Sequence, residues 1–256
     1  MQFLKLSAKA VFLFLLFAFP LFAQTHPSDE DIHKIVERID ELYRANSSYS
    51  VMEMDIVTPH WERTLKMKIW TEGKKKTFIR ITEPAKEQGV GTLRIGNEMW
   101  NYLPKTNKVI KVPPSMMMSS WMGSDFNNDD LVKEFTMVDD YTYQLITPPN
   151  PGPGLLYIRF IPKEGLPIVW GKIIISARAE DYIPVQENYY DDKGKLMRVM
   201  NFKDIKVFDG RKIPSVLELI PQTEEGHKTV LRYIEAKFNL DIGNDVFTLR
   251  HLRASD

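Results

Sequence analysis

Hydrophobic residues recur with two different periods along the chain, and the first of these predicts a helix. Six apolar residues near the N-terminal end follow helical spacing: Ile32, Ile35, Val36, Ile39, Leu42 and Tyr43. Ser28 and Asp31 precede them with the spacing of a capping pair. We therefore predict an amphipathic helix over residues 29–44, with one apolar stripe that packs against the rest of the protein.

From residue 49 onward the period changes to two, which is typical of half-buried strands. Turn residues such as Gly-Asn and Asp-Gly separate the predicted strands. The strands are predicted over residues 49–57, 64–70, 76–82, 92–95, 99–103, 108–112, 141–146, 155–161, 168–178, 182–190, 195–208, 212–220 and 228–240. A row of this many strands must curl or close, because large twisted sheets do not stay flat.

The alternation stops between residues 113 and 131, in the stretch PPSMMMSSWMGSDFNNDDL. This stretch holds six large apolar residues: Met116, Met117, Met118, Trp121, Met122 and Phe126. Because methionine is unbranched and polarizable, such a cluster makes a surface that can re-pack around ligands of differing shape. An irregular loop that seals the protein's own core is the alternative interpretation. Asn127 or Asn128 is suited to cap a short helix over residues 129–135.

Together these patterns predict a mainly β protein with a few helices. Its strongly curved antiparallel sheet, an incomplete β-barrel, is capped by the helices and by the Met-rich loop. Trp100 and Tyr102 alternate with Asn101 and therefore face the same side of their strand. On a half-open sheet, inward-facing aromatic residues line a cavity, so both are candidate ligand-binding residues, with a plain core role as the alternative.

The first 23 residues have the layout of a secretory signal peptide. Lys5 and Lys9 precede an apolar run over residues 10–19, and Ala23 is a small residue suited to cleavage. The apolar run is short for a membrane span. We therefore expect residues 1–23 to be removed, and residues 24–256 to form a single domain exported to the periplasm.

Charge and cysteine content exclude several classes of function. Without Lys5 and Lys9 the chain keeps 32 basic and 34 acidic residues, a net charge of about −2. This balance does not indicate a nucleic-acid-binding surface. The chain has no cysteine, which rules out disulfides, thiol chemistry and a lipidated N-terminal cysteine.

No motif for catalysis or for a cofactor is recognisable. The five histidines are scattered, and HExxH, GxSxG, P-loop and GxGxxG sequences are missing. Asp125, Asn127 and Asp129 imitate the start of a calcium loop, but Asp130 and Thr136 stand where such a loop needs glycine and glutamate. We therefore expect no catalytic residue, no metal site and no cofactor.

Three pieces of the sequence, in this order, carry a resemblance to a known family. They are MWNYLPKTNKVIKVPP (residues 99–114), MGSDFNNDDLVKEF (residues 122–135) and IEAKFNLDIGNDVFTLRHL (residues 234–252). With the predicted leader, helix and meander, they resemble outer-membrane lipoprotein-sorting proteins of the LolA-like superfamily. The resemblance implies an incomplete, bent antiparallel barrel whose hollow binds lipid. In the best-known carrier an arginine tethers the lid helices; Arg80, Arg94 and Arg159 are strand arginines here, and none can be aligned with it.

The resemblance leaves two functional hypotheses. The first is a soluble, monomeric periplasmic carrier of lipid or lipoprotein acyl chains, whose partners are an inner-membrane transporter and an outer-membrane acceptor. The second is an accessory or sensor module of an envelope transporter or stress system that uses the same hollow. Both are non-enzymatic; an enzyme remains a third alternative only because a composite site can escape notice in a single sequence.

Overall fold

The computed structural model describes residues 29–43, 45–133, 137–166 and 168–254. The predicted signal peptide over residues 1–23 lies outside these ranges. Within them, no helix combines the length and the apolar character that crossing a bilayer requires.

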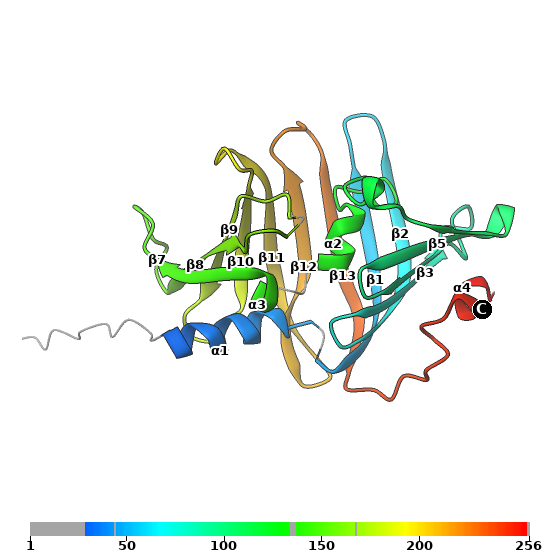
Figure 1. Ribbon diagram of the computed structural model, residues 1–256, viewed down its shortest axis with the longest axis horizontal. Coiled ribbons are helices and arrows are strands. Elements are labelled where there is room, and N and C mark those ends of the chain that lie inside the picture. Colours follow the sequence, from blue (N-terminus) through cyan, green and yellow to red (C-terminus); the bar gives the residue numbers. More distant parts are fainter. Residues whose placement is uncertain (1–28, 44, 134–136, 167, 255–256) are drawn as a thin grey trace, which may run out of the picture.

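A single antiparallel sheet of thirteen strands makes up most of the described chain (Figure 1). Its first six strands are β1 (Ser47–Val57), β2 (Glu62–Glu72), β3 (Lys76–Glu83), β4 (Gly91–Ile95), β5 (Glu98–Leu103) and β6 (Lys108–Lys111). The other seven are β7 (Tyr141–Ile146), β8 (Leu155–Pro162), β9 (Lys172–Arg178), β10 (Pro184–Tyr190), β11 (Leu196–Phe208), β12 (Arg211–Pro221) and β13 (Lys228–Phe238). The predicted fold class is confirmed.

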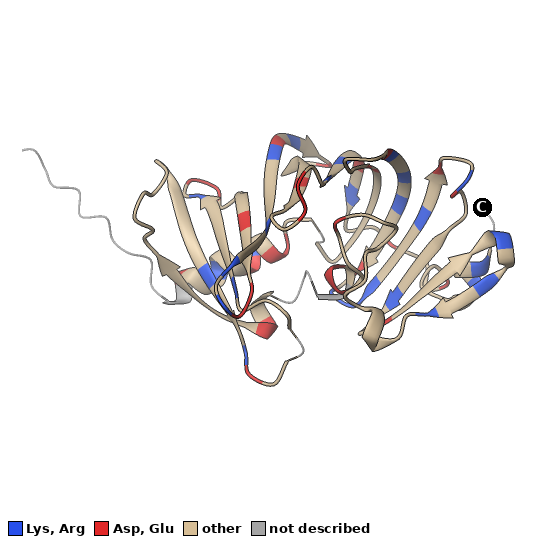
Figure 2. Cartoon of the chain, turned by 90° about the horizontal axis from the view of Figure 1, so that it is seen from above, with Lys and Arg blue, Asp and Glu red and all other residues tan. Residues whose placement is uncertain are grey.

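The order of the strands places the two halves of the chain side by side. Strands that follow one another in sequence are neighbours, and β1 pairs with β13, so β6 and β7 form the two edges. In Figure 1 the central strands run upright while β7 and β8 at one end, and β3 and β5 at the other, run across them. Figure 2 shows the same bend from above. The twist that accumulates over thirteen strands therefore produces a concave face and a convex face.

Short helices cover parts of both faces. They are α1 (Asp29–Asp40), α2 (Asn128–Lys133), α3 (Met137–Asp140) and α4 (Leu249–Arg253), with 3-10 turns at Pro104–Thr106 and Pro114–Met116. The first three lie over the concave side, and α4 packs against β4 on the convex side.

Helix α1 ends at Asp40, four residues before the predicted end. The apolar residues that extend the helical pattern, Leu42 and Tyr43, belong to the following turn. Tyr43 stacks on Tyr233 of β13 at 5.3 Å and donates a hydrogen bond to the carbonyl of Pro214 at 3.2 Å. Tertiary packing therefore ends the helix earlier than its periodicity indicates. Helix α2 starts one residue earlier than predicted, and the end expected at Phe135 lies outside the described residues.

The C-terminal segment is held on the convex face by a buried arginine. Phe247 and Leu252 pack on an apolar cluster of β3, β4 and β5. Arg80, which is 3% exposed, donates from Nη2 to the backbone carbonyls of His251, Leu252 and Ala254 at 3.0, 3.1 and 2.9 Å. A guanidinium at this position supplies donors to backbone carbonyls at the C-terminal end of α4.

We expect Arg80→Met to destabilise the protein by about 2 kcal/mol, because hydrogen bonds to a charged group are lost and buried carbonyls are left unpaired. Urea denaturation measures this loss, and trypsin should cleave the freed C-terminal segment faster. Arg232→Met, at a side chain that is 39% exposed, is the control and should cost less than about 1 kcal/mol. Equal effects of the two variants would contradict a special role for Arg80.

Candidate ligand-binding site

The concave face carries an apolar floor where β1, β2 and β3 meet. Alternate residues of these strands point to this face, as the period of two requires. The buried members of the floor are Met52, Met54, Ile56, Leu65, Met67, Ile79 and Ile81, joined by Met99 of β5 and by Trp121. The sheet therefore offers a continuous apolar surface on the side that the helices cover.

The Met-rich segment (residues 113–131) lies across this floor and is hydrogen-bonded to three strands. The Trp121 indole donates to the hydroxyl of Thr92 in β4 at 3.2 Å. The Asp125 backbone N–H donates to the hydroxyl of Thr229 in β13 at 2.9 Å, and that hydroxyl donates to the Asp125 carboxylate at 2.7 Å. Arg63 of β2 donates to the backbone carbonyl of residue 122. The segment is thus docked on the sheet by specific polar contacts at several points.

A fourth and stronger attachment joins α2 to β11. Asn127 and Asp130 cap α2 reciprocally, each side chain accepting a hydrogen bond from the other residue's backbone N–H at 2.8 Å. Both Asp130 oxygens also accept hydrogen bonds from Arg198, at 2.6 and 2.7 Å, and both side chains are 8% exposed. The Arg198 guanidinium lies 4.5 Å from the Trp170 ring and 4.2 Å from the Tyr189 ring. This buried bidentate pair fixes the C-terminal end of the Met-rich segment.

Helices α1 and α3 cover the concave side beyond the Met-rich segment. The apolar stripe of α1 predicted from the sequence is buried, and it packs with Met137 of α3 in the largest apolar cluster. Asp40 at the end of α1 is buried and forms an ion pair with Lys74, with an oxygen–nitrogen distance of 3.2 Å. Apolar packing, the Asp40–Lys74 ion pair and a hydrogen bond between His33 and the Tyr143 hydroxyl of β7 therefore attach the helix to the sheet.

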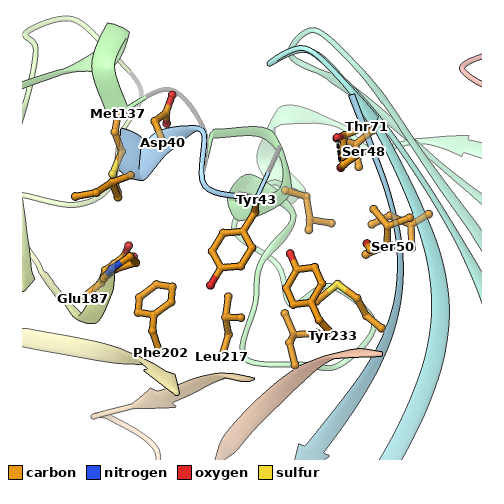
Figure 3. Close-up of a pocket in the computed structure, with 18 residues that line it drawn as sticks. Asp40, Tyr43, Ser48, Ser50, Thr71, Met137, Glu187, Phe202, Leu217 and Tyr233 are labelled. Carbon is orange, nitrogen blue, oxygen red and sulfur yellow. Dashed lines mark hydrogen bonds between the residues drawn. The ribbon is translucent and has the colours of Figure 1, made fainter. Parts of the chain in front are cut away.

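A cavity of about 140 Å³ lies between these helices and the concave face (Figure 3). Its apolar lining residues are Ile39, Tyr43, Met52, Ile69, Ile79, Leu131, Met137, Pro184, Phe202, Leu217, Leu231 and Tyr233. Its polar lining residues are Asp40, Ser48, Ser50, Thr71, Thr77 and Glu187. An engineered cavity of about 150 Å³ holds benzene, whereas pockets for larger ligands measure about 300–1,000 Å³. A long acyl chain therefore needs the lining residues to move apart.

Figure 3 shows the polar groups on two sides of the cavity. Ser48, Ser50 and Thr71 lie on one side, and Glu187 on the other. Glu187 is buried and accepts a hydrogen bond from the Tyr189 hydroxyl at 2.5 Å. Burial raises the pKa of Glu187 to about 7, although the Tyr189 hydrogen bond and the charge of Arg198 act in the opposite direction.

The six predicted site residues in the Met-rich segment divide between its inner and outer sides. Met117 and Met122 are half-buried against the apolar floor, and Trp121 is buried in it. Phe126 is buried and belongs to the same apolar cluster as the stripe of α1 and Met137 of α3. Met116 and Met118 point outward and are 51% and 45% exposed. None of the six lines the 140 Å³ cavity, but the floor under the inner residues is continuous with it through Met52 and Ile79.

The other two predicted site residues, Trp100 and Tyr102, lie on the convex face. They share one side of β5, as the alternation predicts, and pack with Phe247 and Leu252. Met99 and Asn101 occupy the concave side of the same strand, where Asn101 accepts a hydrogen bond from Thr92 at 2.7 Å. The structure thus separates this aromatic pair from the Met-rich segment by the thickness of the sheet.

Several cavity residues were not singled out from the sequence. Leu131 comes from α2 at the end of the Met-rich segment and Met137 from α3. Phe202, Tyr233 and Glu187 come from strands far along the chain. On the concave side of β1 the side chains change from hydroxyl-bearing, at Ser48 and Ser50, to apolar from Met52 onward. The neighbouring strand β2 runs the opposite way and changes from apolar side chains to Thr71. That shift is visible in the sequence, and it marks the polar end of the cavity.

Arg198 binds Asp130 of α2, at the C-terminal end of the Met-rich segment. Of the three strand arginines considered from the sequence, Arg80 binds the C-terminal segment instead. Arg94 of β4 donates from Nε to the carbonyl of Gly96 at 3.0 Å. Arg198 was overlooked because its partner, Asp130, is 68 residues away in the sequence.

The chain matches the model of a family described as uncharacterized protein over residues 73–254. Because this match covers more than half of the chain, the protein belongs to that family. No curated protein matches the sequence.

Three solved structures share the fold over most of the chain. A DUF1329 family protein from Desulfovibrio piger has a TM-score of 0.78 at 23% identity, covering 86% of this chain and 97% of its own. A domain assigned to an outer membrane lipoprotein-sorting protein from Vibrio parahaemolyticus has a TM-score of 0.75 at 18% identity. The match covers 87% of this chain and 98% of that domain. A LolA superfamily protein from Nitrosomonas europaea has a TM-score of 0.71 at 20% identity, and the match covers 85% of this chain and 97% of that protein. The LolA-like fold expected from the sequence is thereby confirmed.

Proposed function

We propose that this family member is a periplasmic carrier that binds acyl chains of lipids or lipoproteins reversibly, without covalent chemistry. The observation that carries the proposal is the covered apolar hollow on the concave face. Its floor is apolar and its cover consists of short helices and the Met-rich segment. The fold shared with a LolA superfamily protein and with an assigned lipoprotein-sorting domain supports the same function.

We place the acyl chain along the apolar floor, partly beneath the Met-rich segment. The 140 Å³ cavity is too small for a long chain, but Met52 and Ile79 connect it to the floor on which Met117 and Met122 rest. Burial of a chain contributes about 0.8 kcal/mol per methylene. The net binding free energy is smaller than this, because the acyl chain must displace contacts between the segment and the floor. Those contacts re-form when the chain leaves, so the segment favours both binding and release.

The proposal also covers the processing and partners of the chain. Residues 1–23 act as a cleaved leader, and residues 24–256 form one binding domain around the continuous sheet. An inner-membrane transporter supplies the acyl cargo and an outer-membrane acceptor receives it. Fractionation tests the location: intact leader retained in the inner membrane would contradict a periplasmic shuttle.

Binding is tested with the purified mature protein. Lipid extraction followed by mass spectrometry should recover acyl lipids from protein isolated in its native envelope. After delipidation, the uncharged probe N-phenyl-1-naphthylamine should bind saturably with increased fluorescence. Absence of both acyl lipid and saturable probe binding, together with a stable co-purifying protein, would favour the sensor or accessory function instead.

The inner methionines of the segment should matter for binding and the outer ones should not. Replacing both Met117 and Met122 by serine should weaken probe binding by about 2 kcal/mol, because each is half-buried and full burial contributes about 1.5–3 kcal/mol. Replacing Met116 and Met118 by serine is the matched control, since both are exposed, and it should leave binding unchanged. Fluorescence titration measures both, and circular dichroism verifies folding. If the inner variant unfolds and the parent protein never binds the probe, the segment only seals the core.

A further inference from the structure

A row of buried polar side chains crosses four strands of the concave face. Ser48 of β1 pairs in register with Thr71 of β2, Thr71 with Thr77 of β3, and Thr77 with Arg94 of β4. Cross-strand partners in an antiparallel sheet point to the same face, with Cβ atoms about 4.5–5.5 Å apart. All four residues are at least nine-tenths buried. The row borders the apolar floor, and three of its members line the cavity.

Two neighbouring groups of this row have unsatisfied hydrogen-bonding atoms. Ser48 and Thr71 bond to each other, with a distance of 2.7 Å between their hydroxyl oxygens. The Thr77 hydroxyl and Nη1 of Arg94 are both buried, and neither has a hydrogen-bond partner in the described chain. Thr77 lines the cavity directly. Orphaned buried polar atoms are uncommon in native proteins, and two at adjacent register positions indicate a missing common partner.

Arg94 also has no acidic partner in the part of the chain that the structure describes. The side chain is 2% exposed, and its one hydrogen bond among the described residues is to the Gly96 carbonyl. Burial without a compensating charge lowers the pKa of Arg94 to about 10. Buried charges in proteins are ordinarily paired, because an isolated one is costly. Arg198, by contrast, is buried with a bidentate carboxylate.

The two carboxylates that line the cavity do not fill this role. Asp40 is paired with Lys74. Glu187 bonds to Tyr189 and lies across the cavity from Ser48 and Thr71 in Figure 3. A guanidinium N–H requires an acceptor, and a threonine hydroxyl can donate to the same oxygen atom or group. An anionic group that enters from the cavity would satisfy both.

We infer that Thr77 and Arg94 form a binding site for the anionic head group, a carboxylate or a phosphate, of an acyl ligand whose chain lies on the apolar floor. This inference rests on the proposed function and adds the chemical class of the ligand. Arg94 supplies a charge-assisted hydrogen bond and Thr77 a neutral one. An uncharged ester end accepts only weaker hydrogen bonds and brings no negative charge to Arg94, so it gains less from this site than a carboxylate does.

The test is displacement of N-phenyl-1-naphthylamine by matched ligands at pH 8, each below its micelle-forming concentration. Hexadecanoate should bind the native protein about tenfold more tightly than methyl hexadecanoate, which has the same chain without the charge. Arg94→Met should abolish this preference and leave the affinity for the ester unchanged. Thr77→Val, which keeps the shape of the side chain, should reduce the preference about threefold. Arg159→Met removes the same charge from β8 and should behave like the native protein.

Urea denaturation distinguishes a ligand site from a structural role. Without ligand, Arg94→Met should be at least as stable as the native protein, because it removes a buried unpaired charge. Hexadecanoate should stabilise the native protein but not the variant. Loss of ligand-free stability in Arg94→Met, or equal affinities of the native protein for acid and ester, would overturn the anion site.

The source of the anion follows from a third ligand, 1-hexadecanoyl-glycerol-3-phosphate. Tighter binding than hexadecanoate indicates a phospholipid head group, and weaker binding indicates a free fatty acid; both support the site. If acid and ester displace the probe equally, the proposed carrier function stands and the anion site fails. If the probe does not bind at all, the carrier function fails, and stabilisation by hexadecanoate against urea still decides the anion site.

Discussion

Replacing Asp130 by alanine is expected to destabilise the protein by about 3–5 kcal/mol, because the change leaves Arg198 buried without its carboxylate. The variant also loses the reciprocal cap that starts α2. Urea denaturation of the native and variant proteins measures the difference. Replacing Asp130 and Arg198 together by leucine and methionine should recover most of the loss, since the isolated charge is then absent.

The matched control is an ion pair at the surface. Lys111 and Glu98 have side chains that are each 55% exposed, and Glu98→Ala should cost less than about 1 kcal/mol. If Asp130→Ala costs no more than this, the attachment of α2 to β11 contributes little, and the Met-rich segment is held by its apolar contacts alone. If the double replacement of Asp130 and Arg198 is as unstable as Asp130→Ala, the lost stability comes from the helix cap of α2 and not from the ion pair.

The strands were predictable because each half-buried strand carries its own alternation. The predicted range 141–146 coincides with β7, and most others differ by one or two residues at either end. Strand β9 begins at Lys172, four residues later than predicted, because Ile168 and Trp170 pack on the core without joining the ladder. The apolar character of these two residues indicates burial, which periodicity alone cannot distinguish from strand pairing.

The contents of the site were less predictable because they depend on which face a residue occupies. Alternation correctly placed Trp100 and Tyr102 on one side of β5, but it does not say which side is concave. That choice is made by the C-terminal segment, whose Phe247 and Leu252 cover them. In the Met-rich segment the absence of a regular period left inner and outer residues indistinguishable. Its docking contacts with the sheet, among them those of Trp121, Asp125 and Asp130, orient it.

The polar row shows a further limit of sequence reasoning. Ser48, Thr71, Thr77 and Arg94 are spread over 47 positions and are ordinary residues in their strands. The register of three strand pairs brings them together. Their shared burial, and the orphaned atoms of two of them, become visible only when the sheet is assembled.

Glu187 should make the stability of the protein fall as the pH rises from about 4.5 to about 7. Burial raises the pKa of this carboxyl in the folded protein to about 7, from 4.5 in the unfolded chain. Between these values the folded state keeps a proton that the unfolded state releases, so the favourable contribution is complete below pH 4.5 and is lost as the pH rises through 7. A shift of this size corresponds to about 3 kcal/mol.

Comparison with Glu187→Gln isolates this contribution, because glutamine does not titrate and the other groups cancel in the difference. The stability of Glu187→Gln relative to the native protein should rise by about 3 kcal/mol between pH 5 and pH 8.5, measured by urea denaturation. Glu218→Gln is the control of opposite sign, because a hydrogen bond from Lys203 lowers the pKa of Glu218 in the folded protein. The stability of this variant relative to the native protein should fall as the pH rises through the range in which Glu218 titrates, and should then stay level. Parallel pH profiles for Glu187→Gln and the native protein would show that the Glu187 carboxyl is already ionised in the folded state. The cavity would then hold a buried charge opposite its hydroxyl groups.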